Sequence, residues 1–257
     1  MRKLLSVDAF RMLKSRWLWL CIIGMLAMAV AFVVMQYTAM DYTVPLSRVI
    51  FLPMSFYGMA CSALISLFVG GDFKDGFVRN KIIAGHSKRH IFISNFIVSA
   101  VTCIVVYVIT TLFTAALGCL LFENDVLPLS FVKYLFMGVG MCFAYSCIYC
   151  TISMVCGNKT TSVVVCMGLA FFMLCACLHT NQVMVQPVFK NGEPNPAYVD
   201  GFIKVVYGFL HDFNPSGQAA QLSSMSIFHS IRWIVCDLLW ILPTAVGSFI
   251  FGRKNIQ

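Results

Sequence analysis

Acidic side chains are almost absent from the long apolar stretches of this chain, and Asp237 is the only one inside them. A charged group in a stretch long enough to cross a membrane is costly, so it usually faces protein or water. Arg232 lies five residues earlier, about 7 Å along a helix and on another face. We therefore expect a cation from another helix, Arg48 or Lys133, beside Asp237. The carboxylate would belong either to a path for a substrate or proton, or to a structural ion pair.

A histidine and a pair of cysteines are the other groups that could do chemistry in these stretches. His179 precedes three polar residues at 180–182, where it could line a transport path or join a structural hydrogen-bond network. Cys147 and Cys150 form a CxxC pair without suitably spaced histidines. All twelve cysteines lie in apolar stretches, so we interpret them as small packing residues and expect neither disulfides nor a metal site.

Sequence motifs for nucleotide binding and hydrolysis are missing. The chain has no G-x-x-x-x-G-K-[ST], H-E-x-x-H or G-x-S-x-G pattern, and no acidic pair within an apolar stretch. We therefore expect no enzyme activity and no cofactor bound by this chain. The apolar stretches also lack the several charges of a proton-driven antiporter, so an energy source would have to come from a partner.

The elements that position these groups are expected to be membrane helices. Apolar residues make up 60% of the 257 and charged residues only 11%, which is typical of a polytopic membrane protein. Since a span needs about 20 apolar residues, we predict an all-α protein whose residues 1–257 form one transmembrane domain. The six predicted spans are 17–37, 49–70, 91–121, 134–156, 160–184 and 233–251.

The distribution of basic residues predicts the orientation of these spans. Thirteen of the 18 Lys and Arg residues fall in 1–16, 71–90, 157–160 and the tail, and five fall in the alternate connections. Lys and Arg are enriched in cytoplasmic loops, so both termini are predicted to lie in the cytosol. The net charge of +8 is thus a topology signal, and we expect no nucleic-acid partner.

The first sixteen residues are basic and predict a helix lying in the membrane interface ahead of the first span. Leu5, Ala9, Met12 and Leu13 form an apolar stripe at helical spacing. A cleaved signal peptide ending near 29–31 is the alternative, although the apolar run continues beyond that point.

The polar loop at 71–90 predicts a short helix between two spans. Asp72 would cap this helix, Asp75 would lie in its first turn, and Gly85 would end it in a left-handed conformation. Ser87 is expected to cap the next span. Val78 and its neighbour four residues on would form an apolar ridge, with 79–81 pointing away from it.

Two further connections have a predictable shape. Gly157 is expected to end the fourth span, with Thr160 or Thr161 opening the fifth. The long outer connection at 185–229 contains an apolar segment, 198–210, that is too short to span and predicts an interfacial helix. A turn at Asn214–Pro215 should begin another short helix reaching Met225.

The order of these features resembles that of ABC-2 type transporter permeases, in particular the bacitracin-type and lantibiotic-type exporters. The resemblance is carried by Asp72–Phe73, the segments 76–81 and 85–89, the Pro-Ser-Gly-Gln stretch at 215–218, the elbow helix and the basic tail. It implies a bacterial cytoplasmic-membrane subunit that pairs with a second permease copy or a sibling permease. ATP and Mg would be bound by separate ABC ATPase subunits. The cargo would be a peptide antibiotic, bacteriocin or hydrophobic drug moved outward.

The same resemblance implies that the loop at 71–90 contains a coupling helix on which the ATPase docks. The docking surface would comprise Arg79, Asn80, Lys81, Ile82 and Ile83, with Asp72 and Asp75 pairing with basic residues of the ATPase. Two alternatives remain open. One is a secondary transporter driven by an ion gradient through Asp237 or His179, and the other is a non-catalytic membrane scaffold or sensor.

Overall fold

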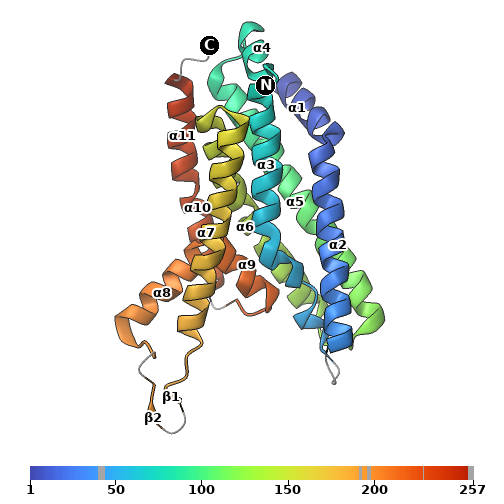
Figure 1. Ribbon diagram of the computed structural model, residues 1–257, viewed down its shortest axis with the longest axis vertical. Helices are drawn as coiled ribbons and strands as arrows, with labels where there is room; N and C mark the ends of the chain where they lie inside the picture. The colour runs from blue at the N-terminus through green and yellow to red at the C-terminus, as the bar shows by residue number, and fades with distance from the viewer. Residues whose placement is uncertain (40–43, 191–192, 196–197, 228, 254–257) are drawn as a thin grey trace.

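The computed structural model describes residues 1–39, 44–190, 193–195, 198–227 and 229–253, and it is an all-α protein (Figure 1). Within these ranges, six helical segments are long and apolar enough to cross a membrane, as the sequence predicts. The elements are α1 (Arg2–Lys14), α2 (Arg16–Ala39), η1 (Leu46–Arg48), η2 (Leu52–Phe56), α3 (Tyr57–Lys74), α4 (Phe77–Ile83), α5 (Lys88–Leu121), α6 (Pro128–Cys156), α7 (Lys159–Met184), β1 (Phe189–Lys190), β2 (Glu193–Pro194), α8 (Gly201–Phe213), α9 (Pro215–Ser223), α10 (Ser230–Leu239) and α11 (Ile241–Arg253).

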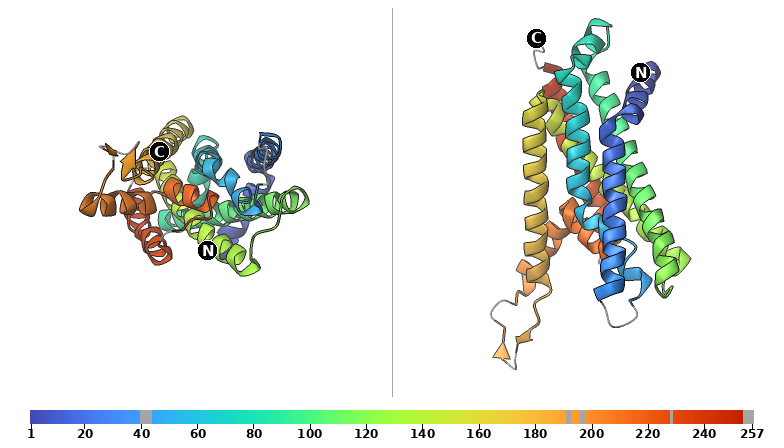
Figure 2. Two further views of the ribbon diagram at one scale, coloured as in Figure 1. Left: turned by 90° about the horizontal axis from the view of Figure 1, so that it is seen from below. Right: turned by 45° about the vertical axis from the view of Figure 1, so that its right-hand side comes forward.

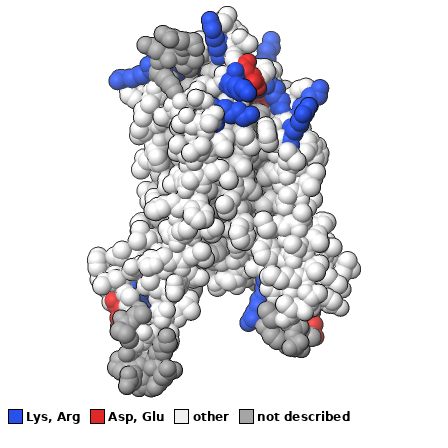
Figure 3. Space-filling view, in the orientation of Figure 1, with Lys and Arg blue, Asp and Glu red and all other residues white. Residues whose placement is uncertain are grey.

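The spans form an elongated bundle with two different ends. Helices α1 and α4 and the carboxyl end of α11 lie at one end, which we call the terminal end (Figures 1 and 2). Helix α8 and the β1–β2 hairpin lie at the opposite, distal end. Figure 3 shows Lys and Arg gathered at the terminal end, above a broad uncharged band. This is the uneven distribution of Lys and Arg from which the sequence predicts the orientation of the spans.

Two of the predicted spans are not continuous α-helices. The second begins as the 3₁₀ helices η1 and η2, and its α-helix starts only at Tyr57. Pro53 lies at the start of η2 and lacks a backbone donor. The sixth is divided into α10 and α11 at Trp240. The ring of Pro243 would clash with the carbonyl of Leu239, the last residue of α10.

Most predicted helix ends agree with the structure. Ser87 caps α5 by accepting a hydrogen bond from the backbone N–H of His90, and Gly85 and Gly157 have the expected positive φ angles of 84° and 65°. The start of the fifth span was predicted wrongly. The side chain of Asn158 caps α7, and helix α7 begins at Lys159, before the two threonines.

The short helices of the long connection differ in their surroundings. Helix α8 leaves large apolar side chains exposed, among them Phe202 and Ile203, as expected of a helix in the membrane interface. Helix α9 is almost entirely buried and packs against η2, α3, α6 and α7. It therefore enters the bundle from the distal side and supplies polar groups to its interior.

Candidate coupling site at the terminal end

Helix α4 presents one face to the bundle and another to solvent. It follows Gly76, which has a left-handed φ of 70°, so the chain turns sharply out of α3. Val78 and Lys81 are buried, and Ile82 is half-buried against the core. Arg79 and Asn80 are exposed, and Ile83 is 73% exposed. The apolar ridge that the sequence predicts is thus present, but it faces the protein itself.

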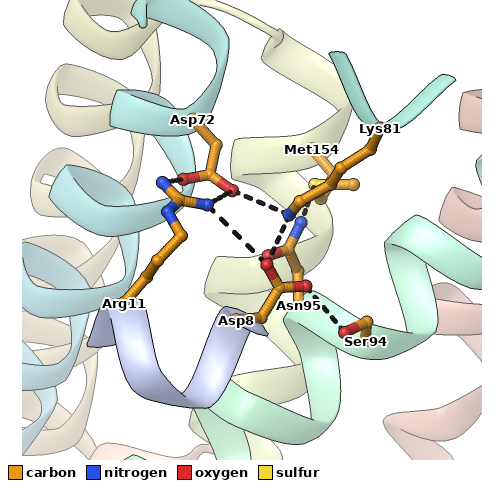
Figure 4. Close-up of polar contacts among 7 residues, drawn as sticks. All are labelled: Asp8, Arg11, Asp72, Lys81, Ser94, Asn95 and Met154. Atoms are coloured by element: carbon orange, nitrogen blue, oxygen red, sulfur yellow. Dashed lines mark hydrogen bonds and ion pairs between the residues drawn. The ribbon is translucent and has the colours of Figure 1, made fainter. Parts of the chain in front are cut away.

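A buried cluster of four charged side chains holds α4 in place (Figure 4). The charge cluster consists of Asp8 and Arg11 from α1, Asp72 from α3 and Lys81 from α4. The two Nη atoms of Arg11 donate to Asp72 at 2.6 and 3.1 Å, a bidentate pair. The Lys81 Nζ lies 2.6 Å from Asp8 Oδ1 and 3.2 Å from Asp72 Oδ2. Lys81 therefore bridges both carboxylates.

Helix α5 adds a neutral partner to the charge cluster. The hydroxyl of Ser94 donates to Asp8 Oδ2 at 2.7 Å, and the neighbouring Asn95 donates to the sulfur of Met154 at 3.7 Å (Figure 4). The guanidinium of Arg11 also lies 3.6 Å from the ring centroid of Phe77 at the start of α4. Four elements, α1, α3, α4 and α5, thus meet at this point.

The charge cluster is electrically balanced and almost dry. The side chains of Asp8 and Asp72 are 0% and 1% exposed, and that of Lys81 is 9% exposed. A buried charge is tolerated only when it is paired and hydrogen-bonded, and removing one partner leaves the other uncompensated. Two carboxylates and two cations satisfy this condition together, so each of the three helices that supply them depends on the other two.

This arrangement corrects two of the predicted docking residues. Asp72 does not cap α4 but lies in the last turn of α3, and it and Lys81 are occupied by partners within the chain. Neither can pair with another protein without breaking the charge cluster. Asp75 is exposed, and it ends α3 instead of lying in the first turn of α4. Together with Arg79, Asn80 and Ile83 it forms the part of the predicted docking surface that solvent reaches.

Asp8 is a member of the site that the sequence analysis missed. The predicted apolar stripe of α1 was partly wrong, because Leu13 is 62% exposed and the buried face carries Leu4, Asp8 and Met12. These three residues follow one another at a spacing of four, so they share a face. A lone carboxylate between two buried apolar residues was the available signal for an internal ion pair.

Two hollows lie beside the end of α3 at the terminal end. One, of about 270 Å³, lies between α1 and the end of α3 and is lined by Arg11, Asp72 and Asp75. The other, of about 720 Å³, lies between the end of α3 and the α6–α7 turn and is lined by residues including Lys74 and Asn158.

The polar residues predicted in the spans lie far from α4 in the sequence and have other partners. Asp237 in α10 accepts a hydrogen bond from the side chain of Gln218 in α9 at 2.9 Å. The expected cation was wrong: no Lys or Arg of the described ranges forms an ion pair with Asp237. Arg232 instead bonds to Asp212 of α8 at 3.3 Å. The sequence did not identify α9 as the partner of Asp237, because the insertion of this helix into the bundle depends on tertiary packing.

Asp237 is buried yet borders an apolar cavity of about 360 Å³ between α5, α6 and α10. His179 does not join it. Its side chain is exposed near the carboxyl end of α7, and its ring lies 6.2 Å from that of Tyr207. All twelve cysteines are free, and no cluster of metal-ligating side chains occurs in the part of the chain that the structure describes.

The sequence pattern of a family described as "Protein of unknown function (DUF2705)" matches residues 14–198. The chain belongs to this family. No curated protein matches the chain. The DUF2705 match includes Asp72, α4, Lys81 and Ser94, but it begins after Asp8 and Arg11 and ends before α8. Two members of the charge cluster, Asp8 and Arg11, therefore lie outside the DUF2705 segment. The Gln218–Asp237 and Arg232–Asp212 contacts also lie outside it.

Proposed function

We propose that this protein is the membrane-spanning permease subunit of an ATP-driven ABC exporter, in which α4 is the helix that receives a separate ATPase subunit. The observation that carries the proposal is the charge cluster. A helix that transmits motion must be exposed on one side and fixed to the spans on the other. Arg79, Asn80 and Ile83 supply the exposed side, and Lys81 fixes the helix to α1 and α3.

The remaining parts of the proposal concern partners and cargo. ATP and Mg would be bound by the ATPase, in keeping with a chain that has no P-loop motif. A second permease copy or a sibling permease would complete the transport path in a bacterial cytoplasmic membrane, with both termini in the cytosol. The cargo would be a peptide antibiotic, a bacteriocin or a hydrophobic drug carried outward. The basic terminal end supports this orientation (Figure 3).

The test is purification of the tagged protein from native membranes in mild detergent, with identification of any ATPase that accompanies it. The variant is Arg79→Glu with Ile83→Asp, because both side chains are exposed and their change leaves the charge cluster intact. The matched control makes the same changes at the distal end, Lys133→Glu with Ile203→Asp, again at exposed residues.

We expect a P-loop ATPase to accompany the wild type and the control and to be absent from the Arg79→Glu, Ile83→Asp variant. An ATPase that accompanies all three proteins equally would contradict docking on α4. If none accompanies the folded wild type, the exporter proposal fails.

One observation favours an ion-driven transporter as the second candidate. Asp237 is a buried carboxylate within a span, and among the described residues it is held by an amide and not by a cation. Such a group could exchange a proton during transport. This candidate predicts transport that is abolished in Asp237→Asn and unaffected by ATP depletion. The exporter proposal predicts that transport is lost on ATP depletion and on substitution of Arg79 and Ile83. A scaffold or sensor would show no ATP-dependent transport in the wild type.

A further inference from the structure

A cavity of about 600 Å³ opens at the distal end between the end of α7, helix α8 and the start of α10. Its walls combine apolar groups, such as Met184 and Val205, with the polar side chains of His211, Lys204 and Arg232. This cavity is independent of α4 and of the transport proposal.

His211 lines this cavity and carries an unused hydrogen-bond donor. Its Nδ1 lies 2.8 Å from the amide nitrogen of Gln221, and that nitrogen also donates to Asp212 Oδ1 at 2.7 Å. The amide oxygen of Gln221 accepts from the indole of Trp233 at 3.2 Å. These contacts fix the orientation of the amide, so Nδ1 of His211 is an acceptor and the ring proton lies on Nε2.

The Nε2 donor of His211 has no hydrogen-bond partner within the described ranges, although the side chain is only 3% exposed. Burial lowers the pKa of His211, against the opposing effect of Asp212, so the ring is neutral near pH 7. A buried donor without an acceptor costs free energy that a ligand could recover. The group that fits this donor is an acceptor, such as an oxygen of a phosphate.

Two carboxylates and two basic side chains line the cavity, and the basic side chains are the groups that can meet an anionic acceptor. The carboxylate of Asp212 is already bound by Gln221 and by Arg232, and that of Asp200 accepts from the backbone N–H of Gly201 at the start of α8. Lys204 is exposed at the cavity wall, and Arg232 uses only one of its nitrogens on Asp212. Two cations at the cavity wall can therefore approach the same bound group, and the buried Nε2 donor of His211 lies beside this wall.

The position of α8 indicates where such a ligand comes from. Phe202 is 80% exposed, and Ile203, Val205 and Phe209 are also exposed on this helix. A short helix with bulky apolar side chains directed outward lies at the boundary between acyl chains and headgroups. We propose that the cavity binds the phosphate headgroup of a phospholipid from the leaflet at the distal end.

The experiment is native mass spectrometry of the full-length protein after lipids are removed by detergent exchange. Phosphatidylethanolamine is titrated back, diacylglycerol serves as the lipid without a phosphate, and inorganic phosphate is added as a competitor. The principal variant is Gly208→Leu. A Cβ at Gly208 would have ordinary contacts, 3.6 Å to Arg232 and 4.0 Å to Met184, so the larger side chain extends into the cavity without a backbone clash. Gly168→Leu is the matched control, because nothing lies within 4 Å of a Cβ there.

A second pair of variants changes the charge of the cavity wall and not the shape of the cavity. Lys204→Ala removes an exposed cation of the cavity, and Lys133→Ala removes an exposed lysine of α6 outside it. We expect one tightly bound phosphatidylethanolamine in the wild type and both controls, and about a tenfold loss of affinity in Lys204→Ala, the effect of one lost charge-assisted hydrogen bond. Gly208→Leu should lose the bound lipid.

Three results would overturn the proposal. The first is undiminished lipid binding by Gly208→Leu, and the second is equal binding of diacylglycerol, which would show that the phosphate is not recognised. The third is displacement of the lipid by millimolar inorganic phosphate, which would identify the free ion as the ligand of the cavity.

Discussion

Lys81 is the residue whose removal should reveal most about the charge cluster. Lys81→Met keeps the length of the side chain but leaves Asp8 without its 2.6 Å ion pair. Breaking a buried ion pair by removing one partner costs about 3–5 kcal/mol. Asp72 retains its bidentate bond to Arg11, and Asp8 retains the hydroxyl of Ser94 and a 3.7 Å ion pair with Arg11. We therefore expect a loss of unfolding free energy near the lower limit, about 3 kcal/mol.

The double variant Asp8→Asn with Lys81→Met is a more stringent test of the pairing of these two residues. Asp8→Asn alone leaves Lys81 with only Asp72 and should cost about 2 kcal/mol. In Asp8→Asn with Lys81→Met, the carboxylate that loses its closest cation is itself removed, and the Arg11–Asp72 pair remains. The double variant should therefore be no less stable than Lys81→Met alone, which corresponds to a coupling energy of about 2 kcal/mol.

The assay is equilibrium unfolding of the purified protein in mixed micelles, followed by the fluorescence of its four tryptophans. Lys74→Met is the matched control, because Lys74 is an exposed lysine in the last turn of α3 and forms no ion pair with any residue of the described ranges. It should leave stability unchanged. Losses that add within about 0.5 kcal/mol in the double variant would refute the pairing of Asp8 with Lys81.

Two further predictions concern packing and protonation. Gly70→Ala should destabilise the bundle by about 1–3 kcal/mol, because its Cβ would lie 2.9 Å from the backbone of Lys159. Gly71→Ala is the control and should not destabilise it, because nothing lies within 4 Å of a Cβ at that position. Equal thermal stabilities of the two variants would refute the close approach of Gly70 to Lys159. Burial lowers the pKa of His211 below its ordinary value of 6.5, so the unfolded state binds a proton at this ring more readily than the folded state does. The contribution of His211 to the free energy of unfolding is therefore highest above about pH 6.5 and falls as the pH drops below that value. The fall in melting temperature from about pH 7 to pH 5 should be shallower in His211→Gln, and parallel curves would contradict the assignment.

Local signals in the sequence predicted the bundle well. The apolar stretches gave the six spans, and Gly85, Ser87 and Gly157 marked helix ends because capping depends on residues that are close in the chain. The break in the sixth span was not predicted, although its cause is also local. Pro243 was its signal, since a proline inside a helix removes a backbone donor and displaces the preceding turn.

The candidate site was predicted less completely, because its contacts join distant parts of the chain. Arg11 and Asp72 are 61 residues apart, and no periodicity within α1 or α3 relates them. Lys81 was placed on the solvent side of α4 although it follows Val78 by three residues and shares its buried face. A charged residue is expected at the surface unless a partner is known, and its partner Asp8 lies 73 residues away in the chain.

The position of α9 shows the same limit. Its sequence predicted a short helix after Asn214, and the structure has one that begins at Pro215. In the structure α9 packs against the 3₁₀ start of the second span and meets Asp237 through Gln218. These contacts join segments that are distant in the sequence, so neither segment alone indicates them.

The most direct test of ATPase docking on α4 is photo-crosslinking in intact cells. A photoreactive amino acid replaces Ile83, which is 73% exposed, and in a parallel strain it replaces Phe202 at the distal end, which is 80% exposed. We expect position 83 to crosslink to a P-loop ATPase and position 202 not to do so. Crosslinks from position 83 to lipid alone, or to the same proteins as position 202, would contradict it.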